Sequence, residues 1–135
     1  MMKKIHTVGL TAMMAFATVV SAFAAEHTND PLKVVKENVE AKKAVLVDVR
    51  EQSEWNKGHV EGAILLPLSD LQRGVELKLL AEKLPKGKIV YTHCVVGKRS
   101  VTAANILEKL GYHVRPLKAG YKELLAAGFQ KAREE

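Results

Sequence analysis

The sequence predicts one α/β domain built on a central parallel sheet of four to five short strands, with helices on both faces. Two observations lead to this class. Residues 44–49 and 89–92 form short apolar, β-branched runs, which are typical of strands buried on both faces. Segments with helical spacing separate these runs. Because strands that alternate with helices form βαβ units with right-handed crossovers, a parallel sheet is expected.

The first elements can be assigned in chain order. Asp30 is expected to cap a first helix whose first position is Pro31 and which ends near residue 43. The polar composition that follows the next apolar run indicates a loop with one helical turn. These segments are, in order, the buried strand 44–49, the loop 50–62 and a second short strand 63–66.

Apolar residues at helical spacing predict a further helix from Ser69 or Asp70 to residue 84, which Gly74 weakens slightly. The residues that carry this spacing, and that we expect in the core, are Leu71, Val75, Leu79, Leu80 and Leu84. The remaining elements are strand 89–92, helix 100–110, strand 113–117 and helix 121–127. Pro116 indicates an edge or a strand end, because proline cannot donate to the sheet ladder.

The first 24 residues have the pattern of a secretory signal peptide. Lys3 and Lys4 precede an uncharged run, residues 5–25, in which Ala22 and Ala24 form an A-x-A cleavage pattern. An uncleaved membrane anchor is the alternative, which the polar residues within the run and the acidic residues after it disfavour. The expected organisation is a signal peptide at 1–24 and a single domain at 30–130. We expect a periplasmic protein with no membrane attachment after cleavage.

Charge and cysteine content limit the possible partners. The formal charge is +6, but the basic residues form no extended run with interleaved aromatic residues, so we expect no nucleic-acid partner. A mildly basic surface attracts small anions. The five histidines show no metal-ligand spacing, and we expect neither metal nor cofactor. With Cys94 as its one cysteine, the chain cannot form an internal disulfide, and we expect a monomer held by its core.

Cys94 comes just after the predicted strand 89–92, where α/β folds bind ligands. If the following turn curls in front of the sulfur, the amides of residues 95–99 converge into an anion-binding nest at a helix start. Gly97 permits the positive φ that this curl needs. The loop also carries two cations, Lys98 and Arg99. These features favour a thiolate, and His93 is expected in the core because neighbours along a strand point to opposite faces.

The segment Cys94-x-x-Gly97-x-Arg99-Ser100 resembles the active-site loop of the rhodanese family. Two earlier segments are similar to motifs of the same family. They are Val47-Asp48-Val49-Arg50-Glu51, and Glu54 followed by Gly58-His59-Val60-Glu61-Gly62-Ala63. The resemblance covers about residues 32–129, and several motifs in the correct order are more specific than one short pattern.

The resemblance implies a rhodanese-like fold and a sulfurtransferase that moves a sulfane sulfur from thiosulfate, or a similar small anionic donor, to cyanide or a thiol. It implies that Cys94 is the nucleophile that forms a persulfide. The implied substrate-binding residues are Val95, Val96, Gly97, Lys98 and Arg99. The implied supporting residues are Asp48, Arg50 and His59. The segment 118–121 departs from the family pattern, which often has two glycines and a later tryptophan.

Two other functions stay open. A cysteine phosphatase or arsenate reductase would also use Cys94 and Arg99, but those enzymes need a longer loop than the residues 95–98 that separate the two here. The shorter loop suits a sulfur atom better than a tetrahedral oxyanion. The other alternative is a non-catalytic sulfur-carrier or binding module. Such modules often lack the cysteine, which this chain retains.

Overall fold

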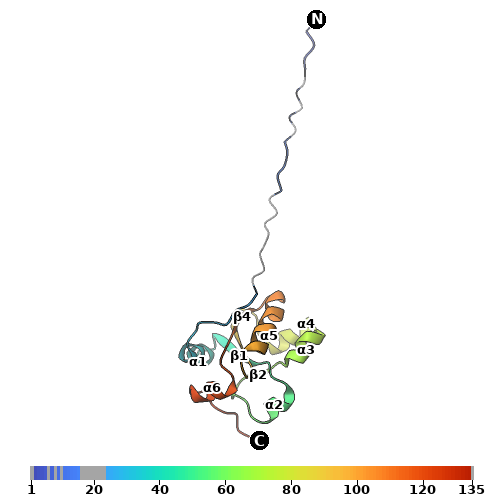
Figure 1. Cartoon of the computed structure of the whole chain (residues 1–135). Helices are drawn as coiled ribbons and strands as arrows, with labels where there is room; N and C mark the ends of the chain where they lie inside the picture. The colour runs from blue at the N-terminus through green and yellow to red at the C-terminus, as the bar shows by residue number, and fades with distance from the viewer. Residues whose placement is uncertain (1, 6, 8, 10, 16–23, 135) are drawn as a thin grey trace.

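The computed structural model describes residues 2–5, 7, 9, 11–15 and 24–134 (Figure 1). The elements are, in chain order, α1 (Leu32–Glu40), β1 (Ala44–Asp48), α2 (Gln52–Asn56), β2 (Ile64–Leu65), α3 (Leu68–Arg73), α4 (Leu77–Lys83), β3 (Ile89–His93), α5 (Lys98–Lys109), β4 (His113–Pro116) and α6 (Tyr121–Ala126). The strands form a four-stranded parallel sheet in the order β2-β1-β3-β4. The predicted fold class is confirmed.

The centre of the sheet is formed by β1 and β3. These strands pair in register from Ala44 opposite Ile89 to Asp48 opposite His93. β4 pairs with β3 and lies at the edge of the sheet, as Pro116 predicts. Because parallel strands end at a common edge, the segments that follow Asp48 and His93 lie next to each other.

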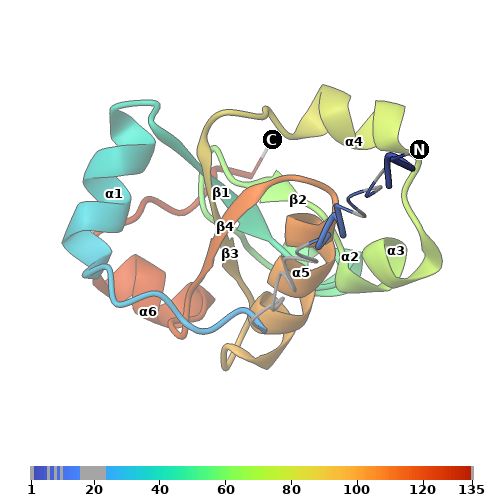
Figure 2. The same cartoon turned by 90° about the horizontal axis from the view of Figure 1, so that it is seen from above.

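Helices cover both faces of the sheet (Figure 2). α3, α4 and α5 pack on one face, where the buried cluster includes Val47, Val90 and Leu107. α1 and α6 pack on the other face, where the cluster includes Leu46 and Tyr91. Successive residues of β1 therefore point to opposite faces, which is the alternation expected of a strand buried on both sides.

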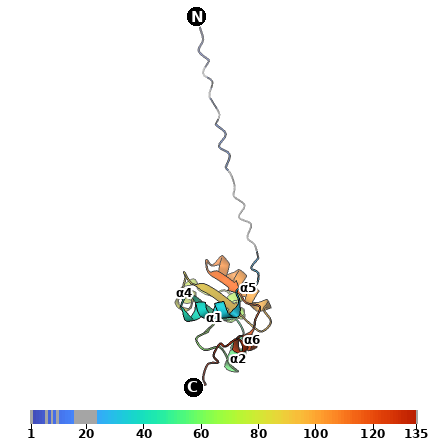
Figure 3. The same cartoon turned by 90° about the vertical axis from the view of Figure 1, so that its left-hand side faces the viewer.

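The C-terminal segment lies at the end of the molecule that also holds α2 and α6 (Figures 1 and 3). Val60 and Lys131 form an antiparallel bridge, and the Glu61 amide donates to the Gln130 carbonyl at 2.8 Å. The loop that follows α2 is therefore tied to the segment that follows α6.

The single helix predicted between Ser69 and residue 84 is wrong. The chain forms α3 and α4 instead, because Gly74 ends α3 with φ 91° and ψ 108°, outside the helical region. The helical phase restarts in α4. As a result Leu79 is 53% exposed and lies outside the core, whereas Leu80 and Leu84 are fully buried.

The prediction that Asp30 caps the first helix is also wrong. α1 begins after Pro31 without a side-chain cap and ends at Glu40, earlier than expected. The Asp30 carboxylate instead accepts hydrogen bonds from the Tyr91 hydroxyl at 2.6 Å and from Arg115 at 2.8 Å. The bond from Tyr91, helped by Arg115, lowers the pKa of Asp30. The Asp30 carboxylate is therefore directed to Tyr91 and Arg115 and not to the first amides of α1.

Part of the predicted signal peptide, including Ala22 of the cleavage pattern, lies outside the described residues. Among the residues that the structure does describe, no helix is both long enough and apolar enough to cross a membrane.

Candidate active site around Cys94

Cys94 directly follows β3 and is 1% exposed. The chain then turns to Gly97, whose φ of 88° lies in the left-handed region, as the sequence predicts. From this position the Gly97 amide donates a hydrogen bond to Cys94 Sγ at 3.1 Å. α5 begins at once, at Lys98 instead of the expected Ser100. The sulfur therefore lies at the N-terminal end of a helix, where an anion is favoured.

The loop around the sulfur is held from two sides. Ser100 Oγ lies 2.8 Å from the carbonyl oxygens of both Gly97 and Leu117. On the other side, the Tyr121 amide donates to the Cys94 carbonyl at 3.2 Å. The start of α5, the end of β4 and the start of α6 thus fix the turn that carries the thiol.

Val95 and Val96 form the exposed tip of the loop, with 48% and 68% of each residue accessible. Lys98 is exposed as well. The structure therefore places these three residues on the surface beside a buried thiol, where they can contact a bound molecule. Their role in binding stays a prediction.

Arg99 is paired with Glu54 of α2. Its guanidinium nitrogens lie 2.6 Å and 2.9 Å from the two carboxylate oxygens, and the side chains are 31% and 32% exposed. The hydrogen bond from Arg99, together with one from the Glu51 amide, lowers the pKa of Glu54 to about 2. Arg99 in turn has a raised pKa because of the same bond.

Glu54 is a site residue that the sequence reasoning did not assign. A signal for it exists, because a cation in the first turn of a helix opposes the helix dipole and needs an anionic partner. The family resemblance implied that Arg99 binds the anionic substrate. In the structure the partner is Glu54, so the guanidinium is already neutralised by the protein itself.

This ion pair leads to a pH-dependent prediction. The folded-state pKa of Glu54, about 2, lies below its ordinary value of 4.5, so the pair stabilises the fold above pH 4.5 and loses this effect as the pH falls toward 2. With a third of each side chain in solvent, we expect Glu54→Gln to cost about 1 kcal/mol at neutral pH. Urea denaturation should show that the difference from the wild type shrinks in acid. Glu40→Gln, in an exposed pair with Lys36, is the control, and an equal loss at every pH would contradict the assignment.

Two of the predicted supporting residues, Asp48 and Arg50, form a buried ion pair at the end of β1. Arg50 Nη2 lies 2.7 Å from Asp48 Oδ2, and the side chains are 6% and 0% exposed. The same guanidinium donates to the Gly58 carbonyl at 2.8 Å and lies over the Tyr121 ring, 4.6 Å from its centroid. Because Tyr121 also holds the Cys94 carbonyl, this pair connects β1 and the loop at Gly58 to the turn that carries the thiol.

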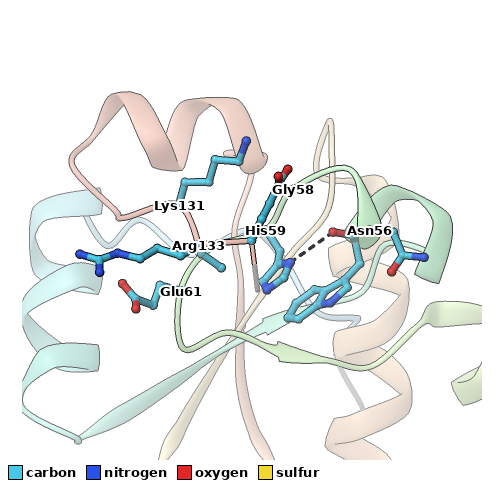
Figure 4. Close-up of a pocket in the computed structure, with 9 residues that line it drawn as sticks. Asn56, Gly58, His59, Glu61, Lys131 and Arg133 are labelled. Carbon is cyan, nitrogen blue, oxygen red and sulfur yellow. Dashed lines mark hydrogen bonds between the residues drawn. The ribbon is translucent and has the colours of Figure 1, made fainter.

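His59, the third predicted supporting residue, lies in a pocket whose lining residues do not include the Cys94 loop (Figure 4). Its ring stacks on Trp55 with the ring centroids 3.6 Å apart, and its Nδ1 lies 3.2 Å from the Trp55 carbonyl oxygen. The pocket has a volume of about 850 Å³ and is also lined by Lys131 and Arg133. His59 therefore braces the turn after α2 at a distance from the thiol loop.

His93 is a core residue, as the strand alternation predicts. It is fully buried, its Nδ1 lies 3.5 Å from the Cys94 carbonyl oxygen, and its Nε2 lies 3.7 Å from Asp48 Oδ2 without a hydrogen bond. Burial lowers the pKa of His93. Across the described ranges, no three His, Cys, Asp or Glu side chains are grouped so that they could hold a metal ion.

Gly120 is a second residue of the site that the sequence reasoning did not assign, although it lies in the segment that departs from the family pattern. A Cβ atom at this position would lie 2.1 Å from the Val95 carbonyl oxygen and 3.0 Å from that of Cys94. Its φ of −98° suits any residue. The requirement for glycine is therefore steric, because the backbone before α6 passes directly against the thiol loop.

We expect Gly120→Ala to destabilise the protein by about 2 kcal/mol or more, because backbone atoms of the loop must move to admit the methyl group. The measurement is urea denaturation. Gly62→Ala is the control: its φ of 77° is strained for alanine but the surrounding space is open, so about 1 kcal/mol is expected. A loss at Gly120 no larger than that at Gly62 would contradict the close approach.

Fold and site together define an α/β domain of the rhodanese-like type with a cysteine in the loop between β3 and α5. The rhodanese-like domain family matches residues 32–127, and the chain belongs to this family. It is 39% identical over 83 residues to the uncharacterized protein YqhL of Bacillus subtilis (strain 168), a match that covers 61% of each chain. It is 33% identical over 67 residues to thiosulfate sulfurtransferase PspE of Escherichia coli (strain K12), covering 49% of this chain and 60% of that one.

The chain thus spans about three fifths of the length of these two relatives. Among solved structures, the human single-domain sulfurtransferase TSTD1 superposes with a TM-score of 0.62 at 26% identity, covering 70% of this chain and 92% of that one. Relatives with sulfurtransferase and sulfur-carrier names indicate a family of sulfur-transfer proteins.

Proposed function

We propose that this protein is a sulfurtransferase that moves a sulfane sulfur through a persulfide on Cys94. The donor is thiosulfate or a similar small anion, and the acceptor is cyanide or a thiol. The observation that carries the proposal is the position of Sγ, which lies at the start of α5 with the Gly97 amide donating to it at 3.1 Å. The N-terminal end of a helix and an N–H group directed at the sulfur both stabilise an anion there, first the thiolate and then the persulfide.

The transfer takes place in two displacements. The Cys94 thiolate attacks the outer sulfur of thiosulfate, a new S–S bond forms, and the old S–S bond breaks as sulfite leaves with the electron pair. Cyanide then attacks the terminal sulfur of the persulfide, and the S–S bond breaks to return the electron pair to Cys94 as thiocyanate leaves. A thiolate acceptor would leave as a persulfide in the same way. One difficult transfer is thereby divided into two easier ones.

The ion pair of Arg99 supports this proposal over a cysteine phosphatase. A phosphatase uses the arginine of its loop to bind the oxyanion, often through two parallel hydrogen bonds. Here Nη1 and Nη2 of the guanidinium already donate to the Glu54 carboxylate, which compensates the charge of Arg99.

Two assays run in parallel test the proposal. The purified protein is given thiosulfate and cyanide, and thiocyanate is measured; a second sample is given an aryl phosphate. We expect repeated turnover in the first assay and no hydrolysis in the second. Phosphate release without thiocyanate would replace this proposal by the phosphatase. If each protein molecule takes up one sulfur atom but does not form thiocyanate repeatedly, the protein is instead a sulfur-carrier module.

We also propose that the protein is exported to the periplasm and cut after Ala24, as the sequence pattern at Ala22 and Ala24 indicates. Cell fractionation followed by intact mass measurement should find a periplasmic chain that begins at Ala25. Replacing Ala24 by tryptophan should leave the precursor uncut, because signal peptidase sites need small residues. A full-length chain that stays in the cytoplasm would contradict the proposal.

A further inference from the structure

The segment before α1 lies against the thiol loop and is fastened at several points. Its residue His27 is exposed and lies within hydrogen-bond distance of that loop. The contacts that fasten the segment are the Ala25 nitrogen to Asn105 Oδ1 at 2.7 Å, which the terminal amine of a chain cut after Ala24 can also make, the Thr28 amide to the Pro116 carbonyl at 2.8 Å, and the Asp30 carboxylate to Arg115 and Tyr91. Because these anchors lie on both sides of His27, they position its side chain beside the start of α5.

His27 Nε2 lies 2.7 Å from the Gly97 carbonyl oxygen. A carbonyl oxygen only accepts, so Nε2 carries the proton and donates it. The Ser100 hydroxyl is also 2.8 Å from this oxygen, but its single proton is shared with the Leu117 carbonyl. Gly97 is also the N-cap residue of α5, whose carbonyl accepts the first backbone bond of the helix. His27 is therefore the donor that holds the Gly97 carbonyl from outside α5.

Gly97 is the residue whose amide holds the sulfur, and it lies between two parts of the chain. A Cβ at this position would meet His27 Nε2 at 2.8 Å and Lys118 Cα at 3.0 Å. A hydrogen bond to the Gly97 carbonyl therefore restrains the same residue whose N–H group donates to Cys94 Sγ at 3.1 Å. If the bond from His27 is lost, Gly97 can move toward the space that His27 occupied, whereas Lys118 still blocks movement in the other direction.

We propose that His27 is a positioning residue for Cys94: by donating to the Gly97 carbonyl, it keeps the Gly97 amide directed at the sulfur that receives and passes on the sulfane atom. The inference rests on the proposed sulfur transfer at Cys94. His27 itself does not contact Sγ and takes no part in bond making or breaking.

The test compares three variants of the purified protein. In His27→Ala, the rate of persulfide formation from thiosulfate should fall about threefold to tenfold, the effect of one lost hydrogen bond. His27→Gln keeps an N–H donor near the position of Nε2 and should stay within about twofold of the wild type. His113→Ala, which removes an exposed histidine at the opposite end of the sheet from Cys94, should have no effect. A His27→Gln variant as slow as His27→Ala would overturn the donor role.

A second readout does not depend on activity. The amide proton resonance of Gly97 reports its hydrogen bond to sulfur, and we expect it to move upfield in His27→Ala relative to His27→Gln. Neither variant has an imidazole ring, so a ring current cannot explain the difference. If this shift occurs but the wild type forms no persulfide, the positioning role holds and the proposed function fails. If persulfide forms and the resonance and rate are the same in both variants, the positioning role is wrong.

Discussion

Replacing Cys94 by serine is expected to lower thiocyanate formation by about 10³-fold or more. A serine hydroxyl is not ionised at neutral pH and cannot form a persulfide, so both displacements lose their nucleophile. The measurement is the initial rate of thiocyanate formation at saturating thiosulfate. Serine has nearly the shape of cysteine, and its hydroxyl oxygen can still accept a hydrogen bond from the Gly97 amide. The fold should therefore persist.

The control for this variant is Glu108→Gln, an exposed change toward the far end of α5 from Cys94. It should keep the wild-type rate. Thermal unfolding of the Cys94→Ser protein should give a midpoint close to that of the wild type, which separates loss of chemistry from loss of structure. A folded Cys94→Ser protein with substantial activity would show that the transferred sulfur does not pass through this residue.

The largest expected effect on stability comes from Asp48→Ala. This change leaves the Arg50 guanidinium, which is 6% exposed, without its carboxylate partner. Removal of one partner of a buried ion pair costs about 3–5 kcal/mol, because the remaining charge is neither hydrated nor compensated. The free energy of unfolding in urea measures the loss.

The chain offers a matched comparison in Asp70, which pairs with Arg73 at 2.6 Å on the surface, with side chains 50% and 74% exposed. Asp70→Ala should cost less than about 1 kcal/mol, since exposed ion pairs contribute little. The double variant Asp48→Ala/Arg50→Met should recover part of the stability by removing the orphaned charge. If Asp48→Ala costs no more than Asp70→Ala, the buried pair is not the support of the thiol loop described above.

The strands and the thiol loop could be predicted because their signals are local. The apolar runs before Asp48 and His93 have no other stable place than the centre of a sheet. Gly97 marks a left-handed turn by its residue type alone. The split between α3 and α4 could not be predicted in the same way, because the helical spacing of the leucines continues through Gly74, and tertiary packing decides which of them are buried.

The contacts between distant segments could not be predicted from the sequence. Arg99 and Glu54 are 45 residues apart and His27 and Gly97 are 70 apart, and neither spacing has a periodicity that could reveal a contact. Arg99 did carry a local signal, since its position in a helix start called for an anion. His27 carried none, because a single histidine in a polar segment is usually a solvated residue.

The central claim is that Cys94 carries the sulfur as a persulfide, and intact mass measurement tests it most directly. The purified protein is incubated with thiosulfate and separated from excess donor. Its intact mass is then measured before and after cyanide is added. We expect a gain of about 32 Da, one sulfur atom, that disappears with cyanide and never forms in Cys94→Ser. A folded wild-type protein that gains no mass from thiosulfate while thiocyanate still accumulates would contradict the covalent mechanism.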